Sequence, residues 1–314
     1  MTAMTGRRNG RKYMKRAAAV ALSGALALSG AVTAFAEGGP GVTTEAATEA
    51  PAPEPVTEAD INAFYSDAVF VGDSIMEDFQ LFCRQHKGDP FLAQMTFLAR
   101  TSFSLHNAYM PISKKSKHPI WQGEQRFIWE SVRMTGKKTV YMMFGQNDLD
   151  MGKDSVQKYC QLIAKIKEQT PDAKFVIMSM TYTLKGKGKG PINNDNIRAF
   201  NAEMQAVAAQ NGWGFIDMST PTSDGAGNLR PEYCSDHYVH HTNAAYRVWE
   251  NVLKDYAMTT LTQQRSVTAA ETGDATAATA ETAAAAATGE TTAETTGETA
   301  AETAADTAAA ETGV

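Results

Sequence analysis

The stretch "DAVFVGDSIMEDF" (residues 67–79) decides the fold of this chain. Its first half is an unbroken apolar run, typical of a strand that is covered on both faces. Its second half has the character of a helix, so Gly72, Asp73 and Ser74 lie where the strand turns into the helix. Asp73 or Ser74 could simply cap that helix. A serine at this junction also lifts its hydroxyl above the sheet, beside amides that can stabilise an oxyanion.

Strand-like and helix-like segments alternate through the middle of the chain. We expect strands at 67–74, 95–100, 138–148, 173–181 and 213–219, and helices at 75–86, 121–135, 154–169, 194–210 and 242–259. Strict alternation predicts a parallel sheet with right-handed crossovers and helices on both faces. The predicted fold class is therefore α/β, a three-layer α/β/α sandwich.

Polar residues follow most of the predicted strands. They are Gly72–Ser74, Arg100–Ser102, Gly145–Asp148 and Thr181–Lys189, and a further polar segment (233–246) precedes the last helix. In open α/β sheets, ligands bind beyond the carboxyl ends of the strands. We therefore expect these groups to converge on one edge of the sheet.

A nucleophilic serine needs a base to accept its proton and an acid to orient that base. Asp236 and His240 supply such a pair from one short loop, and Asn147 adds a side-chain donor after the third strand. Together with Ser74, these residue types favour an acyl-transfer site.

The chain resembles the SGNH, or GDSL-type, hydrolase superfamily over about residues 64–260. The family's first block, Gly-Asp-Ser, matches residues 72–74, and its third block, Gly-x-Asn-Asp, matches residues 145–148. Its last block, an Asp shortly before a His, matches Asp236 and His240. These blocks occur in the family's order at the expected strand exits.

This resemblance implies a flavodoxin-like parallel sheet and ester hydrolysis without a cofactor. It implies Ser74 as nucleophile, His240 as base and Asp236 as the residue that orients the base. The implied oxyanion hole consists of the backbone amides of Ser74 and Ser102 and the side chain of Asn147.

Two positions depart from the family pattern. The second block normally carries a glycine, and the matching residue here is Ser102, whose backbone amide could still serve if its conformation is kept. The last block is usually Asp-x-x-His, whereas His237 stands at the usual acid position and Asp236 lies one residue earlier. A loop turn could absorb the extra residue; otherwise a Ser–His dyad would remain.

Asp236, His237, His240 and His241 also raise the possibility of a zinc site. Adjacent histidines on an extended loop point to opposite sides, and a second group of ligands is not evident in the sequence. We therefore expect no metal and no cofactor, with His237 and His241 as surface or packing residues.

The N-terminus has the pattern of a signal peptide. Basic residues at 7–16 precede an apolar stretch at 17–28, and Ala34-Phe35-Ala36 resembles a cleavage site. A membrane anchor is the alternative, but the apolar run is short and contains Ser and Gly. We expect a signal peptide at 1–36 and a secreted or cell-envelope location, with no transmembrane span.

Low-complexity segments flank the expected domain. We assign a disordered Thr/Glu/Ala/Pro tether to 37–60, the hydrolase domain to 61–262 and an Ala/Thr/Glu tail to 263–314. The formal net charge of −6 belongs to these arms, because the domain itself is slightly basic. Its cations are dispersed except for "KGKGKG" (185–190), which argues against a nucleic-acid partner.

Cys83, Cys160 and Cys234 are too few to indicate a disulfide-stapled fold. In an exported chain two of them could still pair, and the sequence does not say which two. We expect a monomer.

Two long loops, 103–125 and 183–193, are expected to lie over the catalytic edge and to select substrate. Tyr109, Trp121 and the lysines of 185–189 could offer a stacking surface for sugar rings and a rim for anions. Simple solvation of these loops is the alternative.

The sequence as a whole predicts an exported serine esterase that removes O-acetyl or short acyl groups, for example from glycans, through an acyl-enzyme. The expected partner is thus a small-molecule or glycan ester. A non-catalytic glycan- or protein-binding module on the same scaffold, or an O-acyltransferase, is the alternative.

Overall fold

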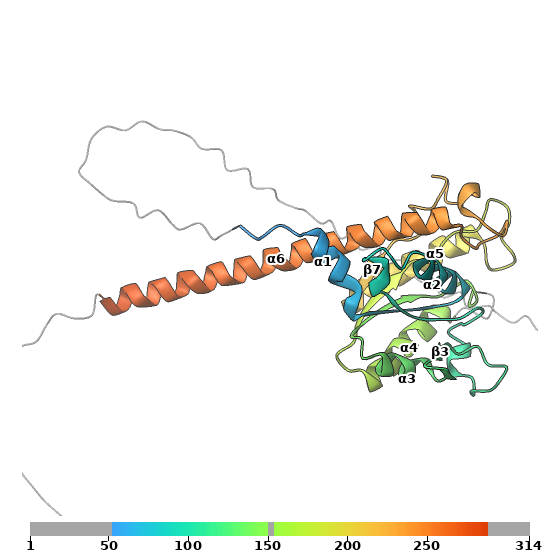
Figure 1. The fold of residues 1–314 in the computed structure, drawn as a ribbon, viewed down its shortest axis with the longest axis horizontal. Coiled ribbons are helices and arrows are strands. Elements are labelled where there is room, and N and C mark those ends of the chain that lie inside the picture. The colour runs from blue at the N-terminus through green and yellow to red at the C-terminus, as the bar shows by residue number, and fades with distance from the viewer. Residues whose placement is uncertain (1–51, 150–153, 288–314) are drawn as a thin grey trace, which may run out of the picture. The chain divides into compact units, whose positions relative to one another are not determined.

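The computed structural model describes residues 52–149 and 154–287 (Figure 1). The expected signal peptide (1–36), most of the expected tether and the end of the expected tail lie outside these residues. No helix within the described ranges is long and apolar enough to cross a membrane.

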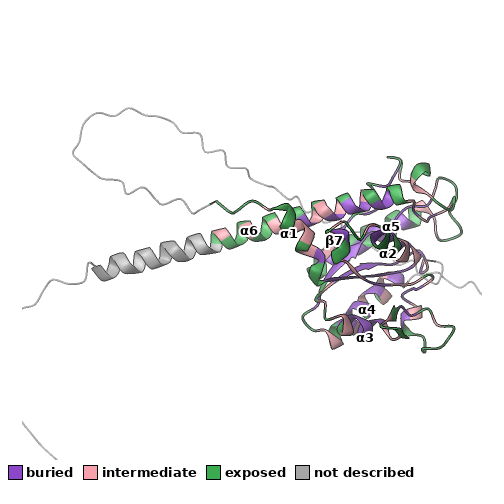
Figure 2. Ribbon diagram, in the orientation of Figure 1, coloured by how far each residue is buried: buried purple, intermediate pink, exposed green. Residues whose placement is uncertain are grey.

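A five-stranded parallel sheet forms the centre, in the order β2-β1-β5-β6-β7. Its strands are β1 (Ala68–Gly72), β2 (Thr96–Ala99), β5 (Thr139–Met143), β6 (Lys174–Met178) and β7 (Gly214–Ile216). Nearly every residue of β1, β5 and β6 is buried, as Figure 2 shows in purple. Burial on both faces explains why these strands are apolar without alternation.

Helices cover both faces of the sheet. The longer ones are α2 (Ser74–Gln85), α3 (Ile128–Thr135), α4 (Ser155–Gln169), α5 (Asn194–Asn211) and α6 (Asn243–Ala287). One core cluster joins α3, α4 and α5 to Val69, Val140 and Phe175, whereas the other joins α2 and the first turns of α6 to Phe70 and Tyr141. Figure 1 shows α6 on one side of the sheet and α3 and α4 on the other. The predicted three-layer α/β fold is confirmed.

The helix predicted at 121–135 is wrong in its first half. Residues 120–125 form a short antiparallel hairpin of β3 (Ile120–Trp121) and β4 (Glu124–Gln125), and α3 begins only at Ile128. Gln122 and Gly123 form the turn with φ angles of 51° and 84°. Positive φ at both central residues is the geometry that joins two strands tightly.

The last helix continues well beyond the predicted 242–259, because α6 ends at Ala287. Its second half is rich in alanine, the residue with the highest helix propensity, and no proline interrupts it. At the other end, α1 (Glu58–Ala63) begins inside the expected tether, and a capping box between Thr57 and Asp60 starts it.

Arg265 of α6 connects these two segments. Its Nη1 donates to the carbonyl oxygens of Glu54 (3.3 Å) and Pro55 (2.6 Å), and its Nη2 lies 2.8 Å from Asp60 Oδ2. Residues just outside the predicted domain boundaries therefore contact each other.

Candidate active site

Ser74 occupies the first position of α2, directly after β1. Asp73 is the N-cap, because its Oδ1 accepts a hydrogen bond from the Ile75 amide at 3.0 Å. A side chain at Gly72 would place its Cβ 2.7 Å from the Met76 Cβ and 2.9 Å from the Met143 oxygen. The glycine thus permits the tight turn, Asp73 caps the helix, and the Ser74 hydroxyl is free for another partner.

That partner is His240. The Ser74 Oγ lies 2.9 Å from His240 Nε2, although the two residues are 166 positions apart in the sequence. With the His240 proton on Nδ1, the hydroxyl donates to Nε2. The serine and the imidazole are therefore in hydrogen-bonding contact.

Asp236 orients the imidazole ring. His240 Nδ1 donates to Asp236 Oδ2 at 2.6 Å, and Asp236 Oδ1 accepts from the amides of Tyr238 (2.8 Å), Val239 (2.8 Å) and His240 (3.1 Å). Partial burial alone would raise the pKa of Asp236, but the hydrogen bonds from His240 and these amides hold it well below its usual range. Asp236 is therefore a carboxylate at neutral pH.

The extra residue between Asp236 and His240 is absorbed by a tight turn around the carboxylate. His237 takes a left-handed conformation with φ of 58° and is exposed. The Ser235 amide closes the turn by donating to the His240 oxygen at 2.9 Å. The carboxylate therefore reaches Nδ1 despite the departure from the family spacing.

A buried tyrosine joins the two halves of the site. Tyr246, in the first turn of α6, donates a hydrogen bond from its hydroxyl to the Ile75 oxygen of α2 at 2.9 Å. This bond connects the helix that begins with Ser74 to the helix that follows His240.

His241 is buried beside Tyr246 and Trp249, with ring centroids 5.6 and 5.4 Å away. Burial, with a smaller effect of the His240 charge, lowers the pKa of His241 to about 3. His241 is thus a neutral residue packed against the first turns of α6.

The predicted oxyanion donors Ser102 and Asn147 follow β2 and β5, the two strands that flank β1 in the sheet. Ser102 adopts φ of 62°, the left-handed conformation that suits the family's glycine, and Asn107 Nδ2 fixes it by donating to its carbonyl oxygen at 2.7 Å. The backbone amides of Ser74 and Ser102 donate no hydrogen bond to any protein group in the described part of the chain. Asn147 Nδ2 donates at 3.2 Å to Asp73 Oδ2 and at 3.4 Å to the Phe103 oxygen.

Two buried carboxyl groups support the strand exits. Asp148 Oδ1 accepts a hydrogen bond from the Leu105 amide at 2.8 Å, which ties the segment after Ser102 to the loop that follows β5. Burial raises the pKa of Asp148 to about 7, against the effect of the Leu105 amide, and the Asp73 charge raises it further. Burial likewise raises the pKa of Asp73 to about 6, although the Ile75 amide opposes this effect.

Asp78 is a carboxyl group near the site that the sequence patterns did not indicate. Burial raises the pKa of this half-buried carboxyl, and the His240 charge opposes the rise, which places Asp78 in the electrostatic environment of the imidazole. Its position four residues after Ser74 on one helix was the available signal, because such residues share a face.

The aromatic residues of the first long loop pack against neighbouring elements. Tyr109 packs on Trp129 of α3 with 5.6 Å between ring centroids, and Trp121 lines a pocket with Cys83 of α2 and Phe97 of β2. Trp121 therefore lies beside the later turns of α2, whereas a sugar-stacking role for Tyr109 stays a prediction. The second loop does reach the site, because the Leu184 amide donates to the Tyr238 oxygen at 2.9 Å.

The far edge of the sheet carries a separate pocket. A pocket of about 420 Å³ lies at the opposite ends of the strands, where Thr139, Lys174 and Gly214 begin β5, β6 and β7. Within residues 52–149 and 154–287, no group of His, Cys, Asp and Glu side chains is arranged to hold a metal ion.

The cysteines do not pair in this structure. Cys83 is buried, and Cys160 and Cys234 are partly buried, each as a free thiol.

A parallel α/β sheet that brings serine, histidine and aspartate into one hydrogen-bonded chain at its carboxyl edge has the architecture of a serine hydrolase. The sequence profile of the GDSL-like Lipase/Acylhydrolase family matches residues 70–248, more than half of the chain. The chain belongs to this family and is a serine hydrolase that acts on ester bonds.

Several solved structures are similar to the chain. A proposed acylhydrolase from Bacteroides fragilis has 20% identity and a TM-score of 0.47, over 62% of this chain and 87% of that chain. A GDSL-like lipase from Bacteroides thetaiotaomicron has 18% identity and a TM-score of 0.45, over 62% and 88%. A carbohydrate esterase of family 3 from Talaromyces cellulolyticus has 15% identity and a TM-score of 0.45, over 63% and 98%. No curated protein sequence matches the chain.

Proposed function

We propose that this chain is an exported serine esterase that removes O-acetyl or other short acyl groups from glycans, with Ser74 as the nucleophile. The observation that carries the proposal is the continuous chain from Ser74 Oγ to His240 Nε2 (2.9 Å) and from His240 Nδ1 to Asp236 Oδ2 (2.6 Å). Each link has the length and partner that proton transfer from a serine requires.

In the first half-reaction, His240 Nε2 accepts the hydroxyl proton while Ser74 Oγ attacks the ester carbonyl. The negative oxygen of the tetrahedral intermediate is then stabilised by the amides of Ser74 and Ser102. Asn147 would join them by exchanging its long contacts with Asp73 and Phe103 for the oxyanion. His240 gives its proton to the departing alcohol, and an acyl-Ser74 ester remains.

In the second half-reaction, His240 takes a proton from a water molecule, and the resulting hydroxide attacks the acyl carbonyl. The bond between the acyl carbon and Ser74 Oγ then breaks, His240 returns the proton to Oγ, and the carboxylic acid leaves. Asp236 stays ionised throughout and stabilises the imidazolium, because its pKa lies well below its usual range. The side chains of His240 and Asp236 are each 34% exposed, so the site is open to ester groups on a polymer. The N-terminal pattern supports export, and we propose a monomer.

The test is the Ser74→Ala variant assayed with a short-chain aryl ester. We expect kcat to fall by at least about 10³-fold, with the melting temperature nearly unchanged. Ser235→Ala is the matched control, because this exposed serine lies in the same loop as Asp236 but outside the proposed chain of proton transfer. Retained turnover in Ser74→Ala would exclude this serine as the nucleophile.

A separate assay distinguishes hydrolysis from acyl transfer: product analysis of the wild-type reaction in the presence of a sugar acceptor.

A further inference from the structure

A lysine-rich hairpin lies next to the proposed catalytic loop. Residues 184–193, which we call the lysine hairpin, contain Lys185, Lys187 and Lys189, all exposed. The Lys189 amide donates to the Ile192 oxygen at 2.8 Å, and the Ile192 amide donates back to the Lys189 oxygen at 3.0 Å. The hairpin backbone is therefore held by its own hydrogen bonds.

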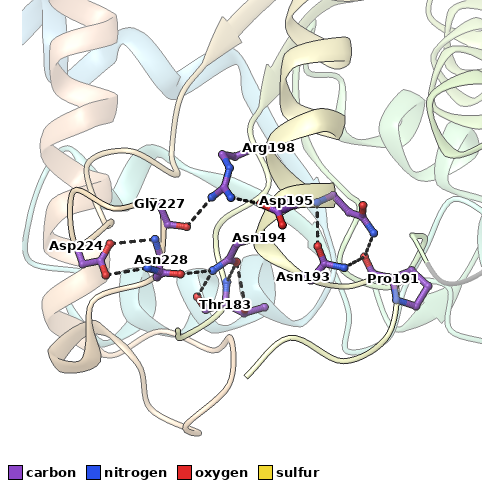
Figure 3. Close-up of polar contacts among 10 residues, drawn as sticks. Thr183, Pro191, Asn193, Asn194, Asp195, Arg198, Asp224, Gly227 and Asn228 are labelled. Carbon is purple, nitrogen blue, oxygen red and sulfur yellow. Dashed lines mark hydrogen bonds and ion pairs between the residues drawn. The ribbon is translucent and has the colours of Figure 1, made fainter. Parts of the chain in front are cut away.

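A network of polar side chains anchors the base of the hairpin (Figure 3). Asn194 Oδ1 accepts from the Thr183 amide (2.8 Å) and hydroxyl (3.0 Å), while its Nδ2 donates to the Thr183 oxygen (3.0 Å) and to Asn228 Oδ1 (2.9 Å). Asn228 in turn donates from its Nδ2 to Asp224 Oδ2 at 3.0 Å. Both the start of the hairpin and the neighbouring loop are thus fixed to the first turn of α5.

The hairpin contacts the loop that carries the proposed base. The Leu184 amide donates to the Tyr238 oxygen at 2.9 Å, and Lys189 Nζ lies 4.1 Å from the centroid of the Tyr238 ring. Tyr238 itself donates its amide to Asp236 Oδ1 at 2.8 Å. Lys189 is therefore placed beside the residues that hold His240, and not on a distant surface.

The three lysine charges of the hairpin are not paired with carboxylates in the part of the chain that the structure describes. Among the described residues, none of its three lysines forms an ion pair with a carboxylate, whereas Lys158 and Lys254 each do. Like charges on one short hairpin repel each other, and an anionic ligand would relieve that repulsion. Several ammonium groups within five residues suit a ligand with more than one negative charge.

The hairpin also lacks the features of a lipid-binding surface. Six of its ten residues are lysine or glycine, and its two large apolar residues, Leu184 and Ile192, are both partly buried. Interfacial lipid binding depends on exposed apolar side chains beside the basic ones. An acidic carbohydrate needs only the charges and hydrogen-bond donors that are present.

We infer that the substrate is an ester of an acidic polysaccharide, and that the lysine hairpin binds the carboxylate or phosphate groups of the polymer while the ester lies at Ser74. This inference rests on the proposed function and adds the charge class of the substrate to it. The hairpin acts on binding of the polymer, so its contribution is to KM and falls as salt screens the charges.

The experiment compares two polymers that differ in charge, acetylated polygalacturonate and acetylated dextran. We expect the wild type to release acetate from the acidic polymer with the higher kcat/KM, and the variant Lys185→Gln/Lys187→Gln/Lys189→Gln to lose this preference by about tenfold, mainly through KM. Raising the salt from about 0.05 M to about 0.5 M should reduce the wild-type preference in the same direction.

The matched control is Lys138→Gln/Lys167→Gln/Lys174→Gln, which removes the same charge from exposed lysines near the opposite ends of the strands. This control should keep the wild-type preference. An equal loss in both triple variants, or no preference for the acidic polymer in the wild type, would overturn the inference.

A binding measurement separates this inference from the proposed function. In the Ser74→Ala protein, acetylated polygalacturonate should bind more tightly than acetylated dextran, and the lysine-hairpin substitutions should remove the difference. If the wild type hydrolyses no aryl ester, the proposed function is contradicted. The binding comparison still decides the inference in that case, because it does not depend on turnover. Hairpin-dependent sedimentation with anionic phosphatidylglycerol vesicles, with no preference between the polymers, would also overturn it.

Discussion

At the scale of single residues, Ser102 shows how a backbone shape can be kept when the side chain changes. Its φ of 62° lies in the left-handed region that the family's glycine occupies without strain, and the Asn107 side chain stabilises this conformation. For an ordinary residue this region costs roughly 1–2 kcal/mol, and for a β-branched residue more.

The first prediction concerns this position. Ser102→Gly should retain kcat/KM within about twofold, because glycine adopts the same backbone conformation. Ser102→Val should lower both the melting temperature and kcat, since valine disfavours positive φ and would displace the amide. Steady-state kinetics and thermal unfolding of both variants measure the effect; equal activity of the two would mean that the Ser102 amide takes no part in catalysis.

A second residue-scale prediction follows from Asp148. Burial raises the pKa of this group to about 7 in the folded state, above its unfolded value, so the folded state binds the proton more tightly. The resulting stabilisation is present at low pH and is lost as the pH rises toward 7.

Asp148→Asn keeps an acceptor for the Leu105 amide but cannot ionise. The wild type therefore loses free energy of unfolding as the pH rises from about 5 to about 8, and the variant does not. The free energy of unfolding of the variant minus that of the wild type should increase over this range. Chemical unfolding at both pH values gives the two free-energy differences. A difference that does not change with pH would show that Asp148 does not titrate as its burial implies.

At the scale of elements, the sequence determined more of the sheet than of its connections. Apolar runs gave the strands because β1, β5 and β6 are buried on both faces, and polar residues at their ends gave the position of the site. The β3–β4 hairpin was missed because residues 120–135 also fit a helical pattern, and only the backbone of Gln122 and Gly123 reveals the turn.

The parts of the site that the sequence could not predict depend on three-dimensional contacts. The spacing of Asp236 and His240 left a dyad possible, and the carboxylate reaches Nδ1 only because Oδ1 gathers amides of the same turn. The location of Tyr109 and the proximity of Asp78 to His240 also required the folded chain, since both depend on the packing of distant elements.

A third prediction concerns the contact between α2 and α6. Tyr246→Phe removes the hydrogen bond to Ile75, which joins the helix that carries Ser74 to the helix that follows His240. We expect a loss of about 1 kcal/mol in the free energy of unfolding and a several-fold fall in kcat.

Tyr65→Phe is the matched control. In the wild type, the buried hydroxyl of Tyr65 donates a hydrogen bond to the Leu253 oxygen at 2.8 Å, farther along α6. This variant should lose similar stability and keep its kcat. If kcat falls equally in both variants, the tie at Tyr246 does not position the site.

At the scale of the whole molecule, the packed core ends before α6 does. The last buried apolar residue of α6 among those with described side chains is Ala257, and Arg265 makes the contacts to Glu54, Pro55 and Asp60. Residues beyond 270 should therefore contribute little to the esterase itself.

The fourth prediction is that a chain ending at residue 270 keeps the wild-type kcat/KM and a melting temperature within about 2 °C. Arg265→Gln in the full chain should lower the melting temperature more than this truncation does. This substitution removes the contacts of Arg265 with Glu54, Pro55 and Asp60. A large loss of activity in the truncated chain would place part of the functional site in the Ala/Thr/Glu-rich segment.

The central claim is that Ser74 forms a covalent acyl-enzyme with the help of His240. Intact mass spectrometry after treatment with a fluorophosphonate tests it most directly. We predict a single adduct on the peptide that contains Ser74 in the wild type, no adduct in Ser74→Ala and greatly slowed labelling in His240→Asn. An adduct on another residue, or labelling at the wild-type rate in His240→Asn, would contradict the account.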